Sequence, residues 1–229
     1  MSRPTARRLV CALAASLLTS PGVVAASNDA QRASAVVHLL RAAASDLADP
    51  ADQAALEQLL SAFTDRVTLT HEATAPWVLL TFDRAGLLEG VTVNADILLA
   101  APPLIQRAVI LHELEHLKGA AETRRMLNQV PARWVGPSPR SPAVAGFPGW
   151  LESTARLHHL VRVLVEDEAL ASHRDLRYVE GIIRDHGGLA AYLATLPPEQ
   201  RLPIQRYYER RIQPFVKADG QLDEPRIRR

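Results

Sequence analysis

The fold is decided by residues 108–117, which read AVILHELEHL and lie inside a helical pattern that a Pro-Pro pair opens and that covers residues 102–128. A helix turns by about 100° per residue, so His112 and His116 lie about 40° apart on one face. Two imidazoles on successive turns can bind one zinc ion at ~2.0–2.1 Å. Glu113 lies about 60° beyond His116, which places its carboxylate beside such a site rather than on the metal.

The apolar residues of this helical pattern gather on the side away from the histidines. Ile110, Leu114 and Leu117 fall within about 60° of one another there. An amphipathic helix buries such residues against a core. We therefore expect these three side chains to anchor the helix while His112 and His116 face a cleft.

The segments around this helix predict an α+β fold. Strands are indicated by β-branched and aromatic residues at 67–70, 77–82 and 87–94. Helices are indicated by apolar periodicity at 28–47, 51–65, 150–174, 175–186, 189–195 and 198–213. We expect a small mixed sheet packed on the His-Glu-x-x-His helix, followed by a mostly helical C-terminal half with a frayed tail after Asp219.

Composition is typical of one globular domain. The chain has 229 residues, of which 48% are hydrophobic and 22% charged. Its 26 Lys and Arg residues oppose 25 Asp and Glu residues, so no basic excess points to nucleic acid. Residues 131–149 hold five prolines and three glycines, which predicts a Pro-rich loop inside a single domain covering residues 27–229.

The first 26 residues have the character of a secretory signal peptide. Three arginines precede a short apolar run at residues 9–18, and small residues follow at 24–26. This pattern predicts export to the periplasm of a bacterium or to the medium. No apolar run reaches the ~20 residues that span a bilayer, so we expect no stable membrane insertion after cleavage. Cys11 is the one cysteine, so the mature chain can form no disulfide.

The His-Glu-x-x-His helix resembles the active-site helix of the zincin metallopeptidases. Residues 91–94, which read VTVN, resemble the edge strand that lies beside that helix in zincins and pairs with extended substrate. The resemblance covers residues 88–118 and a downstream glutamate. It implies one zinc ion, with Glu113 as the general base. Glu115 and Lys118 depart from the family pattern, which prefers uncharged residues at both positions; we expect the two to form a solvated pair.

The third zinc ligand is implied most directly by the gluzincin group, in which a glutamate from a later helix completes the site. Glu168 and the alanines that follow resemble that context. By helical phase Glu168 lies on an apolar face, where a carboxylate needs a partner such as a metal. Glu166 lies near Arg162, which can pair with it. Two further carboxylates are candidates to support the ligands: Asp167, next to Glu168 in the chain, and Asp175, which lies on the Glu168 face and could orient a ligand histidine. The apolar face of this helix consists of Leu157, Val161 and Leu164.

The metzincin spacing gives a rival third ligand. Gly119 stands where that group has its glycine, and Glu122 occupies its third-ligand position. We interpret Glu122 instead as an exposed partner of Lys118. The residue that stabilises the oxyanion is left open, with Tyr178 and Tyr192 among the candidates.

The sequence thus predicts an exported zinc metallopeptidase that acts on a peptide or protein substrate. His112, His116 and Glu168 would bind the metal, and Glu113 would take a proton from the zinc-activated water. Two other functions stay open. One is a catalytically inactive zincin-like binding protein, which the unusual Glu115 suggests. The other is a helical periplasmic interaction module that carries the motif by chance.

Overall fold

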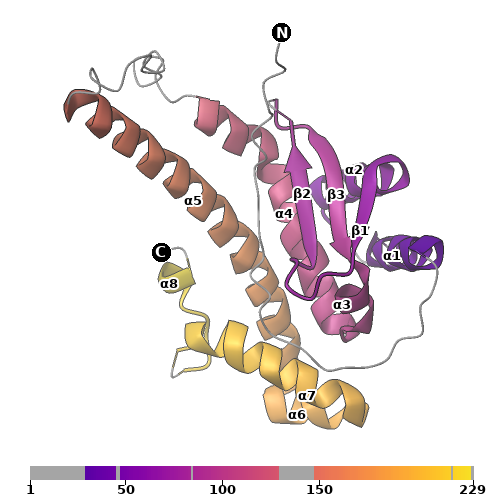
Figure 1. Ribbon diagram of the computed structural model, residues 1–229. Coiled ribbons are helices and arrows are strands. Elements are labelled where there is room, and N and C mark those ends of the chain that lie inside the picture. The colour runs from indigo at the N-terminus through magenta and orange to yellow at the C-terminus, as the bar shows by residue number, and fades with distance from the viewer. Residues whose placement is uncertain (1–28, 45–46, 84, 129–146, 218, 228–229) are drawn as a thin grey trace.

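The computed structural model describes residues 29–44, 47–83, 85–128, 147–217 and 219–227 (Figure 1). The predicted signal peptide lies outside these residues. So do residues 131–146 of the predicted Pro-rich loop, whereas residues 147–149 already belong to a helix.

Helices form most of the described chain, and three short strands lie between the second and the third helix. The strands are β1 (Val67–Thr70), β2 (Val78–Phe82) and β3 (Leu88–Asn94). The α-helices are α1 (Asp29–Ala44), α2 (Pro50–Arg66), α3 (Ala95–Ala100), α4 (Pro103–Asn128), α5 (Phe147–Asp185), α6 (Leu189–Ala194), α7 (Pro198–Tyr207) and α8 (Glu224–Ile227). A π-helical turn, Tyr208–Ile212, and a 3-10 turn, Gln213–Phe215, continue α7.

The three strands form one mixed sheet in the order β1-β3-β2. β3 pairs in parallel with β1, where Val67 lies opposite Val91, and antiparallel with β2, where Val78 lies opposite Val93. The α+β prediction is therefore confirmed. The interpretation of residues 91–94 as an edge strand is wrong, because they belong to the central strand. The edge strand that contacts α4 is β2.

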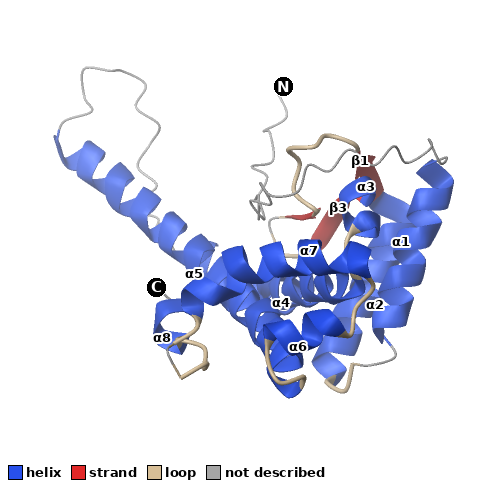
Figure 2. Cartoon of the chain, turned by 90° about the horizontal axis from the view of Figure 1, so that it is seen from below, coloured by secondary structure: helices blue, strands red, loops and turns tan. Residues whose placement is uncertain are grey.

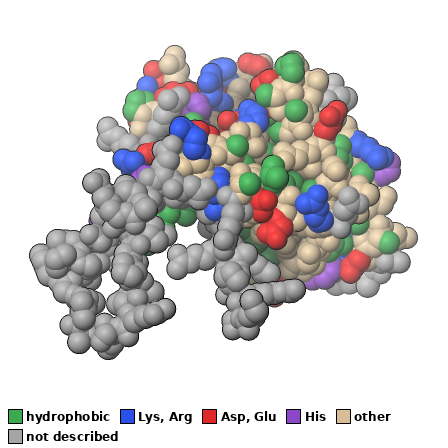
Figure 3. All heavy atoms as spheres, turned by 90° about the horizontal axis from the view of Figure 1, so that it is seen from above, with side chains coloured by type: hydrophobic (Ala, Val, Ile, Leu, Met, Phe, Trp, Pro, Cys, Tyr) green, Lys and Arg blue, Asp and Glu red, His purple; other side chains and the backbone are tan. Residues whose placement is uncertain are grey.

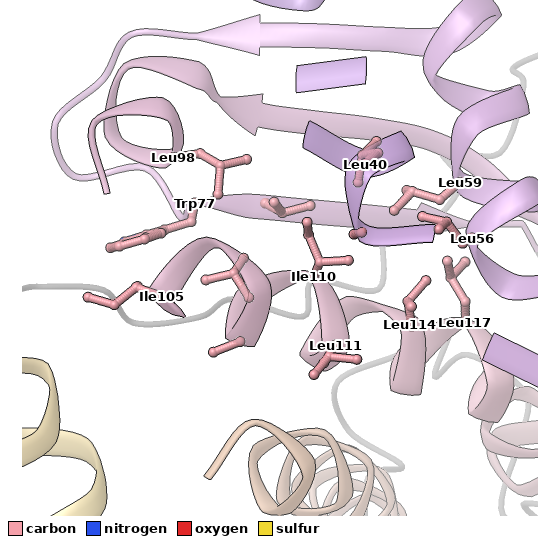
Figure 4. Packing of buried hydrophobic residues seen from close by; sticks show 14 of the residues in the cluster. Leu40, Leu56, Leu59, Trp77, Leu98, Ile105, Ile110, Leu111, Leu114 and Leu117 are labelled. Atoms are coloured by element: carbon pink, nitrogen blue, oxygen red, sulfur yellow. The ribbon is translucent and has the colours of Figure 1, made fainter. Parts of the chain in front are cut away.

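Helix α4 lies between the sheet and α5. Its residues Ile110, Leu114 and Leu117 are buried, and they point toward the sheet and toward Leu56 and Leu59 of α2 (Figure 4). The predicted anchoring face is therefore confirmed. The opposite side of α4 meets α5, and these two have the most extensive contact among the described helices.

Helix α5 is one continuous helix of 39 residues. The sequence pattern suggested two helices that meet at residues 174 and 175. No glycine or proline interrupts this point, and both side chains bind residues of other elements, so the helix continues. The first half of α5 projects beyond the rest of the protein (Figures 1 and 2).

The chain turns sharply after α5 and then folds back along it. Gly187 and Gly188 have φ angles of 84° and 107°, a conformation that glycine adopts readily, and they end the helix near the predicted break. The tail is not frayed throughout, because Glu224 of α8 pairs with His173 and Arg177 of α5. The short helix α3 was not predicted, although Asn94 caps it by accepting a hydrogen bond from the Ile97 amide at 3.3 Å.

Charges of both signs are mixed over the face of the protein shown in Figure 3. No described helix is both long enough and apolar enough to cross a membrane.

The two residues that depart from the zincin pattern belong to a charged network of Asp52, Glu115, Lys118 and Arg174. Lys118 Nζ lies 2.7 Å from Glu115 and 3.0 Å from Asp52. Arg174 Nη1 lies 2.8 Å from Glu115, and its other terminal nitrogen also pairs with Asp52. The predicted Glu115–Lys118 pair is present, but it is not simply solvated. It joins α2, α4 and α5 through two acids and two bases.

Asp52 is the buried member of this network, and its replacement is expected to destabilise the fold. Burial alone would raise the pKa of Asp52, but hydrogen bonds from Arg174 and Lys118 hold that pKa below its ordinary value of 3.8. Asp52→Asn should lower the free energy of unfolding by about 2–4 kcal/mol at neutral pH, because two cations lose their buried partner. Urea unfolding of the two proteins measures this difference.

The pH dependence of this effect has a definite sign. A carboxylate with a lowered pKa contributes stability above its unfolded pKa and loses it as the pH falls through the folded value. The difference between wild type and Asp52→Asn should therefore be full at neutral pH and shrink below about pH 4. The matched control is Glu57→Gln, since Glu57 is exposed on the same helix. Equal stability of all three proteins at pH 7 would contradict the network's role.

Candidate metal centre

Helix α4 brings the two motif histidines together. The Nε2 atoms of His112 and His116 lie 3.0 Å apart. Their ring centroids are separated by 4.7 Å and the ring planes meet at 75°. Each histidine is at most 2% exposed, so the pair is buried rather than facing an open cleft as expected. Two buried nitrogens that converge in this way need a shared partner.

Glu168 of α5 supplies a third donor to this pair. Its Oε1 lies 3.5 Å from His112 Nε2, and its Oε2 lies 3.5 Å from His116 Nε2. A tetrahedral divalent ion with bonds of ~2.0–2.2 Å places its ligand atoms about 3.3–3.6 Å apart. Both Glu168–histidine distances match this separation, whereas the two imidazole nitrogens, at 3.0 Å, lie closer together than it. His112, His116 and Glu168, called the metal cluster below, could thus hold a metal ion.

Glu168 does not lie in the apolar surroundings that helical phase predicted. Leu157 and Val161 of the supposed core-facing side are 59% and 49% exposed. Glu168 itself is partly exposed, its side chain retaining 36% of its accessible surface. It faces the histidines because α5 runs along α4 at this level, and not because the apolar side of α5 enters the core.

Asp167 binds the outer nitrogen of His116. Its Oδ2 lies 2.9 Å from His116 Nδ1, and its Oδ1 accepts a hydrogen bond from Thr123 Oγ1 at 3.0 Å. Gly119 makes room for this contact, since a Cβ there would lie 3.1 Å from Asp167 Oδ1. Gly119 therefore sits within α4 for a packing reason that the metzincin spacing does not explain.

Asp175 lies beside the outer nitrogen of His112, as Asp167 lies beside that of His116. Its Oδ2 lies 3.5 Å from His112 Nδ1, and Arg211 of the π-helical turn approaches the same oxygen to 3.4 Å. Tyr207 lies partly buried beside Arg211 and Asp175, and desolvation raises the pKa of its hydroxyl. Tyr207 and Arg211 were not predicted, because residues this far from the motif along the chain carry no local signal for the site.

The electrostatics of the cluster favour a positive charge at its centre. Burial alone would lower the pKa of His112, but Asp175 and Glu168 raise it to about 9. Burial would also lower the pKa of His116, but Asp167 and Glu168 raise that pKa to about 10. Burial would raise the pKa of Glu168, but the two histidines hold it well below its ordinary range. A carboxylate-rich site that attracts protons in this way suits a cation.

Glu113 is buried beside the metal cluster without belonging to it. Burial raises the pKa of its carboxyl to about 7, although the neighbouring His112 and His116 oppose this shift. Among the described residues its Oε2 atom has no hydrogen-bond partner. A buried carboxyl with a free oxygen and a pKa near neutrality is able to accept and return a proton.

The other candidate carboxylates lie away from the cluster. Glu122 is exposed and pairs with Arg125, not with Lys118 as expected. Glu166 pairs with Arg162, with Nε and Oε1 3.7 Å apart, as its sequence position suggested. Neither belongs to the group of donors that meets at His112 and His116.

The two tyrosines considered for an oxyanion role lie elsewhere. Tyr178 and Tyr192 line a cavity of about 360 Å³ together with Arg107 and Ile110 of α4. Ile110 belongs to the face of α4 that points away from the histidines. The structure therefore assigns neither tyrosine to the metal cluster.

The contact between Asp167 and His116 leads to a prediction about metal affinity. Asp167→Asn should weaken metal binding by about 10–100-fold, because the carboxylate that fixes the ring and raises its basicity is lost. Competition against a chromogenic chelator measures the affinity. Glu166→Gln, one position earlier on the same helix, is the matched control and should bind metal like wild type. Equal affinities for all three proteins would contradict the role of Asp167.

Comparison with known proteins found no match: no protein-family model, no curated protein and no solved structure matches the chain.

Proposed function

We propose that this protein is an exported, zinc-dependent metallopeptidase. The observation that carries the proposal is the meeting of three donors, His112 Nε2, His116 Nε2 and Glu168, beside the buried carboxyl of Glu113. Two imidazoles and one carboxylate form a ligand set that catalytic zinc sites use, and they leave a coordination position for water or substrate. The two aspartates behind the histidines match the support that metal-binding imidazoles generally receive.

Each group has a distinct task in the proposed hydrolysis. When bound, zinc supplies Lewis acidity, which polarises the scissile carbonyl and acidifies water. Glu113 takes the proton of the attacking water and later delivers it to the leaving amine, so no covalent intermediate forms. Asp167 and Asp175 hold the rings of His116 and His112 in the tautomer that directs Nε2 to the centre of the cluster.

The two alternative functions predict different results from one experiment. Metal analysis after mild purification should give about one zinc per chain, and a broad peptide library should be cleaved. Zinc without any turnover would favour a zincin-like binding protein. Absence of stoichiometric metal would favour an interaction module with a chance motif. The ion pairs of Glu115 with Lys118 and Arg174 give its departure from the zincin pattern a structural explanation.

Export has its own test. The arginines, the short apolar run and the small residues at 24–26 lead us to expect a mature chain that begins at Ala26 or Ser27. Mass spectrometry of the protein from the periplasm or medium measures this start. A full-length product in the cytoplasm would contradict export.

A further inference from the structure

An exposed row of aliphatic side chains runs along the projecting half of α5. Leu157, Val161 and Val165 follow one another at intervals of four residues, and they are 59%, 49% and 50% exposed. Side chains with this spacing lie on one face of a helix. The three residues are called the exposed α5 stripe below. Large aliphatic side chains exposed in a continuous row commonly mark a binding surface.

The exposed α5 stripe leads to the metal cluster. Val161 and Leu157 precede Glu168 by seven and eleven residues, so each lies within about 20° of Glu168 around the helix. Arg174 lies about 120° away and reaches the charged network on the other flank of α5. The stripe therefore lies on the same side of α5 as Glu168, whereas His159, which contacts Met126 of α4, lies on the other side. Glu168 is also the one partly exposed member of the cluster, so solvent reaches the metal cluster on this flank.

The stripe has the length and polarity to bind a short stretch of extended chain. From Leu157 to Glu168 the helix rises about 16 Å, which equals about five residues of extended polypeptide. Among the described side chains of this half of α5, which begin at Leu157, the charges nearest the stripe belong to Arg162 and Glu166, and these two pair with each other. The described part of this surface therefore presents aliphatic groups beside a neutralised ion pair.

We propose that the exposed α5 stripe binds apolar side chains of an extended polypeptide substrate and directs the chain to the metal cluster. The inference rests on the proposed peptidase function, and it names the substrate class: segments of polypeptide with several aliphatic residues near the bond that is cleaved. An apolar surface continuous with Glu168 places such a segment within reach of the cluster. A second copy of the chain or a lipid surface would have no need of this continuity.

Peptide binding to an inactive protein tests the inference without requiring turnover. The full chain with Glu113→Gln is mixed with a fluorescent peptide of about ten residues that carries leucine and valine at alternate positions. The same peptide with serine at those positions serves for comparison, and fluorescence anisotropy gives the dissociation constants. The stripe variant adds Leu157→Ser, Val161→Ser and Val165→Ser. The control variant adds Leu87→Ser and Leu202→Ser, which are 61% and 52% exposed on other parts of the surface.

The stripe variant should bind the aliphatic peptide at least about tenfold more weakly than the parent, as expected when apolar contacts are lost from a binding surface. The control variant should bind like the parent, and the serine peptide should bind weakly to all three. Equal binding by the stripe and control variants would overturn the inference. A second result would also overturn it: sedimentation shows that the parent and the control variant are dimers and the stripe variant is a monomer, while all three bind the peptide equally.

This design separates the inference from the function on which it rests. If native protein cleaves no peptide, the proposed function fails, yet the binding comparison still decides whether the stripe holds apolar chain. If cleavage occurs and the stripe variant shows unchanged binding, the function stands and the inference fails. Single variants Val161→Ser and Val165→Ser, each at an exposed position, keep the test valid if the triple variant folds poorly.

Discussion

Glu113→Gln is expected to keep about one zinc per chain while peptide hydrolysis falls by ~10² or more. Glutamine has the size of glutamate but cannot accept the proton of the attacking water. The structure gives a specific reason to expect a large effect, because Glu113 is buried and one of its oxygens has no partner among the described residues. Metal analysis and the rate of cleavage of a library-derived peptide measure the two quantities on the same sample.

The control for this experiment is Glu122→Gln. Glu122 lies on the same helix but is exposed and pairs with Arg125, so its replacement should leave hydrolysis unchanged. If Glu113→Gln cleaved peptide at the wild-type rate, Glu113 would not be the general base. If it lost zinc, the carboxylate would instead serve metal binding.

Glu168→Gln should weaken zinc binding by tenfold or more. The amide offers a neutral oxygen where two imidazole nitrogens and a carboxylate now meet, and damage to a metal site commonly has effects of this size. Competition against a chromogenic chelator gives the affinity.

Glu166→Gln and Glu122→Gln are the matched controls for this ligand. Both carboxylates lie in exposed ion pairs outside the metal cluster, so zinc affinity should not change in either variant. Loss of zinc in Glu122→Gln with zinc retained in Glu168→Gln would show that the metzincin spacing is the correct one. Retention of zinc in all three would place the third ligand elsewhere.

Local periodicity predicted the parts of the fold in which short-range pattern and packing agree. Helix α4 and the three strands lie within one or two residues of their expected positions, because caps, prolines and apolar spacing mark them. The order of the strands was not predictable in this way. β1 pairs with β3 although β2 lies between them in the sequence, so β3 is the central strand. No local pattern distinguishes a central strand from an edge strand in so small a sheet.

The site was predictable where its residues lie on one helix and unpredictable where they do not. The spacing of His112 and His116 alone places both side chains on one face. Glu168 was predicted from the gluzincin resemblance and from helical phase, but Leu157 and Val161 of its predicted apolar face are exposed, since periodicity shows a face without showing what covers it. The contacts of Asp52 with Arg174 and of Asp175 with Arg211 join distant segments. Nothing in the intervening sequence indicates them.

The single helix α5 carries Glu168 and both aspartates that contact the histidines, whereas His112 and His116 themselves belong to α4. A bound cation would therefore be held by residues of both helices. Its binding free energy would add to the free energy that stabilises the packing of α4 against α5. By mass action, the folded state would gain RT ln(1 + [L]/Kd) from an ion that binds only when the helices are together. The melting temperature of this protein would thus rise with the free zinc concentration of its surroundings, and a fall in available zinc would by itself make the protein easier to unfold.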